Sequence, residues 1–185
     1  MIGIDEVGRG CWAGPLLVVA ARSRTELPAG LRDSKKLSKI QRNKFHDLII
    51  QTCDLGEGWV EPAEIDELGL TGAMKLAVSR ALLALGAIAS DKIIMDGSIN
   101  YCAPNFENVE CVVKADDLHP IVSAASIYAK VTRDRRMTEL SLEYPNYGFE
   151  SHVGYGTKIH AAALQKLGIC SLHRKSFKPV YTFLQ

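Results

Sequence analysis

The chain has 185 residues, a formal net charge of +1, 47% hydrophobic residues and 23% charged residues. These values are typical of a globular protein with one buried core, so we expect residues 1–185 to form a single domain. No apolar run approaches the ~20 residues of a membrane helix, and acidic residues come too early for a secretory signal. We therefore expect neither a membrane protein nor a secreted one.

The cysteines and the distribution of charge further narrow the kinds of protein that this sequence could encode. Five scattered cysteines form no Cys-x-x-Cys pair, which argues against a zinc site or a disulfide framework and favours reduced thiols in a cytoplasmic protein. Basic residues gather in two stretches, 32–44 and 158–178, and Asp33 is the one acid among them. Each stretch is consistent with either a solvent-exposed surface or a surface that binds a polyanion, and both interpretations remain open.

The apolar pattern predicts an α/β domain. Strands are expected at residues 1–7, 16–21, 53–60, 92–97 and 109–113, and the continuous apolar run at 16–21 indicates burial on both faces. Helices are expected at residues 39–50, 71–85, 120 to about 143, and 158–167, with Ser38 and Thr157 as N-caps. Residues 62–69 fit a short acidic turn or helix. Small residues at 123–126 would let the long helix lie close to the sheet.

Four carboxylates stand at strand ends. Asp5 and Glu6 end the first strand, Asp96 ends the fourth, and Asp116 follows the fifth. Sites of open α/β sheets assemble at strand ends, and carboxylates that meet there repel one another unless cations lie between them. Oxygen ligands favour Mg²⁺ or Mn²⁺, and two such ions can promote hydrolysis of a phosphodiester. The structural alternatives are a solvated strand end, a turn at Asp96-Gly97 and a helix cap at Asp116-Asp117.

Seven sequence blocks carry a resemblance to a known family. In chain order they are GIDEVGRG at residues 3–10, DSKKLS at 33–38, DG at 96–97, KAD at 114–116, AASIYAKVTRD at 124–134, GYGTK at 154–158 and HRKSF at 173–177. In this order, and over nearly the whole chain, the blocks resemble ribonuclease HII, the type 2 ribonuclease H. The resemblance implies a ribonuclease H-like fold with a mixed five-stranded central sheet flanked by helices.

The same resemblance implies the chemistry. An endoribonuclease of this kind cleaves the RNA strand of RNA/DNA hybrids and acts at single ribonucleotides in duplex DNA, leaving a 3′-hydroxyl and a 5′-phosphate. Asp5, Glu6, Asp96 and Asp116 take the catalytic and metal-ligand positions, with Asp117 a weaker claimant to the fourth. The implied cofactor is Mg²⁺ or Mn²⁺, with two ions in the working site. A role in removing ribonucleotides from DNA follows, with a monomer as the default state.

Substrate contacts also follow from the resemblance. Gly8, Arg9 and Gly10 match a turn that reads the ribose 2′-hydroxyl, through backbone groups that only glycine lets approach so closely. Tyr155 matches a tyrosine that stacks on the sugar following that ribonucleotide. The positions that match phosphate contacts are Ser34, Lys35 and Lys36, and Lys158 and Arg174 are expected to extend that surface.

Two competing readings stay in view. Ribonuclease HIII shares the four-acid site but usually carries an N-terminal substrate-binding domain and a different fourth acid. A non-catalytic hybrid-binding module would keep the fold without the activity. The chain also departs from the family pattern, because Ala115 stands where glycine is usual and Gly69 where relatives often carry asparagine.

The sequence also predicts where one tryptophan and several histidines lie. Trp12 is expected in the core rather than beside the substrate. His46, His119 and His160 are expected on the surface, and His173 in a structural role. The tail at residues 181–185 holds two aromatic residues, which leaves a sliding clamp open as a partner.

Overall fold

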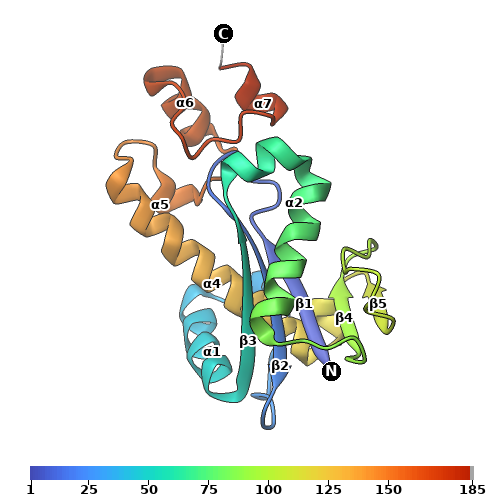
Figure 1. Ribbon diagram of the computed structural model, residues 1–185. Coiled ribbons are helices and arrows are strands. Elements are labelled where there is room, and N and C mark those ends of the chain that lie inside the picture. Colours follow the sequence, from blue (N-terminus) through green and yellow to red (C-terminus); the bar gives the residue numbers. More distant parts are fainter. Residues whose placement is uncertain (184–185) are drawn as a thin grey trace.

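A five-stranded sheet forms the centre of the computed structural model, which describes residues 1–183 (Figure 1). Its strands are β1 (Ile2–Val7), β2 (Leu16–Ser23), β3 (Cys53–Val60), β4 (Ile93–Asp96) and β5 (Val109–Val112). The strand order is β3-β2-β1-β4-β5. β1, β2 and β3 are antiparallel neighbours, whereas β4 is parallel to β1 and β5 is parallel to β4. The predicted mixed five-stranded sheet is confirmed.

Two of the long helices begin at the capping side chains predicted from the sequence. They are α1 (Lys39–Thr52), α2 (Pro62–Leu85), α4 (Pro120–Glu143) and α6 (Lys158–Leu167). The Ser38 hydroxyl accepts a hydrogen bond from the Gln41 amide, and the Thr157 hydroxyl accepts one from the His160 amide. The boundaries of α1, α4 and α6 lie within two residues of those expected from the sequence.

α2 starts earlier than expected and is kinked. Gly69 has φ 65° and ψ 167°, a conformation that breaks the helix and that a side chain at this position would disfavour. The expected acidic segment at 62–69 is therefore the first part of α2. The short helices η1 (Ser34–Lys36), α3 (Ala115–Leu118), α5 (Phe149–His152) and α7 (Lys178–Tyr181) were not expected, because three or four residues carry no periodic signal.

Both faces of the sheet are covered (Figure 1). In β2, Leu16, Val18 and Ala20 pack in one core cluster with residues of α2, whereas the alternate residues Leu17 and Val19 pack in a second cluster with residues of α1 and α4. Successive side chains of a strand point to opposite faces, so an apolar run without alternation is what two covered faces require. The prediction of a strand buried on both faces is confirmed.

The first turn of α4 lies close against β1. A Cβ atom built on Gly3 would lie only 2.6 Å from the backbone carbonyl carbon of Ile121. The glycine therefore permits a backbone approach that any other residue would prevent, and the small residues Ser123 and Ala124 continue this contact surface along the helix. This packing places Ser126 and Lys130 of α4 next to the end of β1, where Asp5 and Glu6 lie.

The C-terminal helices lie beyond the end of the sheet toward which β1 runs (Figure 1). A third core cluster forms there around Ala13, Met137, Phe149 and Leu172. Residues 184 and 185 lie outside the described residues, so the proposed clamp-binding tail is only partly described.

α2 corrects the expectation that the chain holds no apolar segment long enough to span a membrane. Its length and a mean hydropathy of 1.4 meet the criterion for a membrane span. A helix on the core of a globular protein meets the same criterion, and here Met74, Ala77, Val78 and Ala81 are buried against the sheet. Length and composition are therefore weak support for a span.

Candidate active site

The predicted carboxylates lie at neighbouring strand ends. Asp5 and Glu6 belong to β1, Asp96 ends the adjacent parallel strand β4, and Asp116 lies in α3 directly after β5. The Asp96 carboxylate accepts a hydrogen bond of 2.7 Å from the backbone amide of Ala115, which ties the end of β4 to the residue before Asp116. Parallel strands bring their carboxyl ends to one edge, so the sheet itself assembles these residues.

Burial and mutual repulsion raise the pKa of three of these acids. Burial, then the charges of Glu6 and Asp96, raise the pKa of Asp5 well above its usual value. Burial raises the pKa of Asp116 to about 6, with further repulsion from Asp33 and Asp96. The pKa of Glu6 is also raised, first by burial, against the lowering effect of Arg9. The cluster therefore concentrates negative charge that a cation would relieve.

The donor set fits hard divalent cations. Carboxylate oxygens are the ligands that Mg²⁺ and Mn²⁺ prefer, and no histidine or cysteine is among the residues that line the cleft around Asp5, Glu6 and Asp96. Within residues 1–183, no group of three such side chains is already drawn together tightly enough to enclose an ion. Carboxylates that repel one another are expected to stay apart until a cation draws them together, so the residues fit the cofactor by their chemistry.

A cleft of about 330 Å³ opens at this edge of the sheet. Its walls bring together most of the residues singled out from the sequence, namely Asp5, Glu6, Asp96, Gly8, Arg9, Gly10, Ser34, Lys35 and Tyr155. Ser126 and Lys130 also line it and were not predicted as site residues. They are four residues apart on α4, so their i, i+4 spacing within one sequence block was the signal that they share a helix face.

A buried arginine packs closely against the turn after β1. Gly8 has φ 85°, and a Cβ atom there would lie 2.2 Å from Nε of Arg133. The Arg133 side chain is fully buried and donates hydrogen bonds to the carbonyl oxygens of Ala13, Pro15 and Val153. The packing of Arg133 and the backbone conformation therefore require a glycine at position 8. Gly10 differs, because nothing lies within 4 Å of a Cβ atom built on it.

Arg174 corrects a prediction. It was expected to extend the phosphate-contacting surface, but its side chain is fully buried. Its guanidinium donates to the carbonyl oxygen of Arg9 at 3.0 Å and to that of Gly14 at 2.9 and 3.1 Å. Burial lowers its pKa to about 10, so it stays charged at neutral pH. Arg174 supports the turn from beneath and has no path to a bound phosphate.

The other residues predicted to bind substrate differ in exposure and in their distance from the cleft. Lys35 is exposed in the cleft, whereas the Lys36 ammonium lies 2.7 Å from the carboxylate of Asp117. Lys158 is exposed at the start of α6, outside the cleft walls. The Lys130 ammonium lies 5.8 Å from the ring centre of Tyr155, in cation–π range.

Arg9, in the cleft wall, contacts two other side chains. One guanidinium nitrogen lies 3.6 Å from the Glu6 carboxylate, and another donates to the Tyr101 hydroxyl at 3.2 Å. Arg9 therefore offsets part of the negative charge of the acidic cluster.

The departure at Ala115 has a simple structural account. The left-handed residue in this segment is Lys114, with φ 61°, whereas Ala115 is the first residue of α3. An alanine at position 115 is therefore compatible with the backbone conformation of a helix.

A cluster of buried histidines lies behind Tyr155. His160 approaches the Tyr155 carbonyl oxygen at 3.0 Å through Nδ1 and His173 at 3.0 Å through Nε2, and it stacks on His152. Burial lowers the pKa of both His160 and His173 to about 4, so the pair is neutral at pH 7. The expectation of a surface position was wrong for His160 and for His46, which is also buried. The structural role expected for His173 is confirmed.

Trp12 joins the active-site turn to this cluster. Its ring lies against Gly156, where a Cβ atom would come within 2.1 Å of it, and 5.5 Å from the His160 ring centre. Trp12 is half-buried, so the expected core position holds in part.

The mixed sheet, the acidic strand ends and the adjoining glycine turn define a nuclease of the ribonuclease H-like fold. The sequence profile of the family described as Ribonuclease HII matches residues 2–180. The Ribonuclease HII of Coxiella burnetii (strain Dugway 5J108-111) is 44% identical over 181 residues, which are 96% of this chain and 88% of the relative. The chain belongs to the ribonuclease HII family.

Solved structures agree with this assignment. Ribonuclease HII in its complex with PCNA from Archaeoglobus fulgidus has a TM-score of 0.80 and 28% identity, covering 96% of this chain and 94% of that one. The ribonuclease HIII named Bst-RNase HIII, solved with Mn²⁺, has a TM-score of 0.74 at 22% identity and covers 99% of this chain but 68% of its own, which shows the shared fold. Family membership identifies an enzyme, a divalent-metal-dependent ribonuclease H that acts on RNA/DNA hybrids.

Proposed function

We infer that this enzyme cleaves the RNA strand of RNA/DNA hybrids and also cuts on the 5′ side of RNA–DNA junctions, at single ribonucleotides in duplex DNA. The observation that carries this inference is the position of the glycine turn. Gly8, Arg9 and Gly10 line the same cleft as Asp5, Glu6 and Asp96. In the chain they follow Asp5 and Glu6 after a single intervening residue. A ribose read by the turn would therefore lie beside the acids that act on its phosphate.

The acids supply the cation-binding half of the site. Asp5, Glu6, Asp96 and Asp116 would hold Mg²⁺ or Mn²⁺, two ions in the working site. Such ions, when bound, lower the pKa of a water and stabilise a departing oxygen, which gives a 5′-phosphate and a 3′-hydroxyl. The protein's part is to hold these carboxylates at the strand ends. Burial first, and neighbouring carboxylates second, raise the pKa values of Asp5, Glu6 and Asp116.

The turn supplies the ribose-reading half. Gly10 is exposed, and its backbone conformation and surroundings would tolerate a side chain. A glycine that the fold does not require leaves backbone groups open to close approach by a ligand, and the 2′-hydroxyl is both donor and acceptor. Tyr155, which is 39% exposed, offers its ring to the sugar that follows.

Basic side chains complete the binding surface. Lys35 and Ser34 lie in the cleft wall, where they suit the phosphates on either side of the ribonucleotide, and Lys36 and Lys158 suit more distant phosphates. Phosphate contacts of this kind make affinity fall as salt concentration rises. In the cell, removal of ribonucleotides from DNA by a cytoplasmic, monomeric enzyme is the role that suits this substrate preference.

The test uses a DNA duplex with one ribonucleotide, incubated with Mg²⁺ and then with chelator. Asp5→Asn and Asp116→Asn should lose nearly all cleavage while still binding the hybrid. Asp117→Asn is the matched control, because Asp117 is a neighbouring acid that pairs with Lys36, and it should keep most of the activity. Cleavage by the wild-type chain in chelator, or full activity of Asp116→Asn beside an inactive Asp117→Asn, would contradict the assignment.

A further inference from the structure

A second cleft adjoins the catalytic cleft. It has a volume of about 250 Å³ and lies between the first turns of α1 and the middle of α4. Its charged lining consists of Lys39, Arg42, Lys130 and Arg135, with the acids Asp134 and Glu150. Lys130 lines both clefts, so the two share a wall. A strand that crosses the catalytic cleft past Lys130 would enter the second cleft directly.

The charges of this second cleft are unevenly compensated. The Lys130 ammonium lies 2.9 Å from the Asp134 carboxylate, which pairs these two residues. Within residues 1–183, no carboxylate lies within ion-pair distance of Lys39, Arg42 or Arg135. Glu150 is therefore the one remaining acid against three cations, and the cleft keeps an excess of positive charge.

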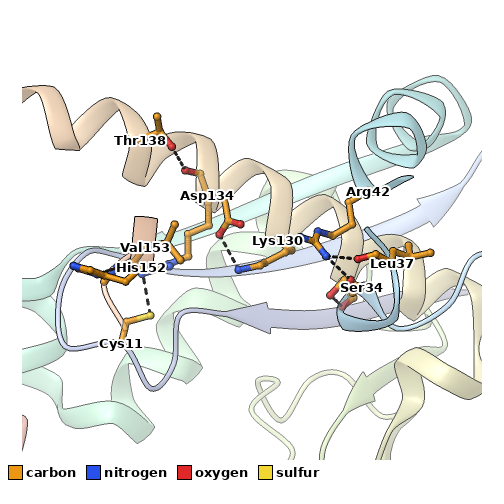
Figure 2. A network of polar contacts seen from close by, with 12 residues as sticks. Cys11, Ser34, Leu37, Arg42, Lys130, Asp134, Thr138, His152 and Val153 are labelled. Atoms are coloured by element: carbon orange, nitrogen blue, oxygen red, sulfur yellow. Dashed lines mark hydrogen bonds and ion pairs between the residues drawn. The ribbon is translucent and has the colours of Figure 1, made fainter. Parts of the chain in front are cut away.

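One of these cations is fixed in place. The Arg42 guanidinium donates hydrogen bonds to the carbonyl oxygens of Ser34 and Leu37, the former at 3.0 Å. Figure 2 shows Lys130 between Asp134 and Arg42, along the side of α4 that faces the segment with Ser34 and Leu37. Arg42 therefore joins the second cleft to η1, which carries Lys35 and Lys36. A rigid cation of this kind binds an anion with little loss of side-chain entropy.

We propose that the second cleft is a subsite for a backbone phosphate of the bound nucleic acid, on one side of the ribonucleotide. The proposal rests on the proposed function. Its lining suits a phosphate rather than a base, because it offers cations together with the Asn43 amide, whereas it contains no aromatic ring for stacking. The subsite would lengthen the footprint of the enzyme along one strand beyond the catalytic cleft.

The variant Lys39→Gln/Arg135→Gln tests this subsite. Both side chains are exposed, so the substitution leaves the core and the Arg42 contacts intact. The matched control is Lys75→Gln/Lys92→Gln, which removes two exposed lysines elsewhere: Lys75 on α2, across the sheet, and Lys92 before the start of β4. Binding of a ribonucleotide-containing duplex is measured in chelator over a range of salt concentrations, and cleavage is measured separately in Mg²⁺.

The cleft variant should reduce the slope of log affinity against log salt by about 0.9, the value for one phosphate, and the control should not. This slope corresponds to roughly an eightfold change in affinity for each tenfold change in salt. The loss should vanish when the duplex arm on one side of the ribonucleotide is shortened to a few base pairs, and persist when the other arm is shortened.

Two results would overturn the proposal. One is a salt slope and affinity equal to those of the control on the long duplex, and the other is a loss that is indifferent to shortening of either arm. Both leave the proposed function intact as long as the wild-type chain cuts the duplex in Mg²⁺. Failure of the wild-type chain to cut would instead refute the proposed function.

Discussion

Replacing Gly8 by alanine should separate the structural requirement for this glycine from the functional one expected at Gly10. Gly8→Ala places a methyl group 2.2 Å from Nε of Arg133, on a backbone with φ 85°. The buried guanidinium must then move away from at least one of the carbonyl oxygens of Ala13, Pro15 and Val153. We therefore expect the substitution to destabilise the whole fold.

The size of the effect follows from two costs. A left-handed conformation costs an alanine about 1–2 kcal/mol. Each hydrogen bond lost by a buried charged group costs roughly 1.5–3 kcal/mol. Gly8→Ala should thus lower the free energy of unfolding by about 2.5–5 kcal/mol, a large part of the roughly 5–15 kcal/mol typical of a domain.

Gly10→Ala is the matched comparison. It meets no atom within 4 Å and needs no unusual backbone conformation, so stability should stay the same or rise by up to about 1 kcal/mol. Cleavage at a single ribonucleotide should nevertheless fall sharply, because the new methyl group stands where the ribose would approach. Denaturant unfolding followed by tryptophan fluorescence, together with cleavage of the single-ribonucleotide duplex, measures both effects.

The comparison can fail in two separate ways. An unfolding midpoint for Gly8→Ala equal to that of the wild-type chain would refute the packing argument around Arg133. Full cleavage at a single ribonucleotide by Gly10→Ala would refute the ribose-reading role of the turn, whatever the stability result.

Two further predictions concern buried charges. The folded-state pKa of Asp116, about 6, lies above its ordinary value, so its ionised form destabilises the metal-free fold above pH 6 and this penalty disappears as pH falls toward 4. Asp116→Asn should therefore be more stable than the metal-free wild-type chain at pH 7 and equally stable near pH 4. Denaturant unfolding at both pH values measures this, and equal stability of the two proteins at pH 7 would contradict the prediction. Arg174→Lys keeps the charge but not the planar fork that holds the carbonyl oxygens of Arg9 and Gly14, and should lose about 1–3 kcal/mol of stability in the same assay; an unchanged midpoint would show that the fork is dispensable.

The main features of the fold were predictable because each leaves a local signal. The apolar run at 16–21 indicated a strand buried on both faces, and Ser38 and Thr157 indicated helix starts. The kink at Gly69 was not predicted, but it falls at the boundary expected between the acidic segment 62–69 and the helix 71–85. η1, α3 and α5 escaped prediction because their three- or four-residue turns form only where the tertiary structure holds them.

The candidate site was predictable where it depends on strand ends, and less so where it depends on burial. Asp5, Glu6 and Asp96 share a cleft because they end adjacent parallel strands, which the sequence pattern conveys. Arg174 and His160 were misplaced, because a basic residue in a basic stretch resembles surface until the backbone carbonyls that surround it are known. Long-range contacts of this kind leave no periodic or spacing signal.

The two halves of the site are stabilised in different ways. Arg133 and Arg174 hold the turn after β1 from two sides through backbone carbonyl oxygens, and these bonds need neither substrate nor cation. The carboxylates, in contrast, repel one another, and Arg9 offsets only part of their charge, so bound cations would relieve the rest. Binding energy is therefore not required to order the turn that we propose to read the ribose. Under the proposed function, cleavage would require bound cations, whereas the shape of this turn is already built into the apoprotein.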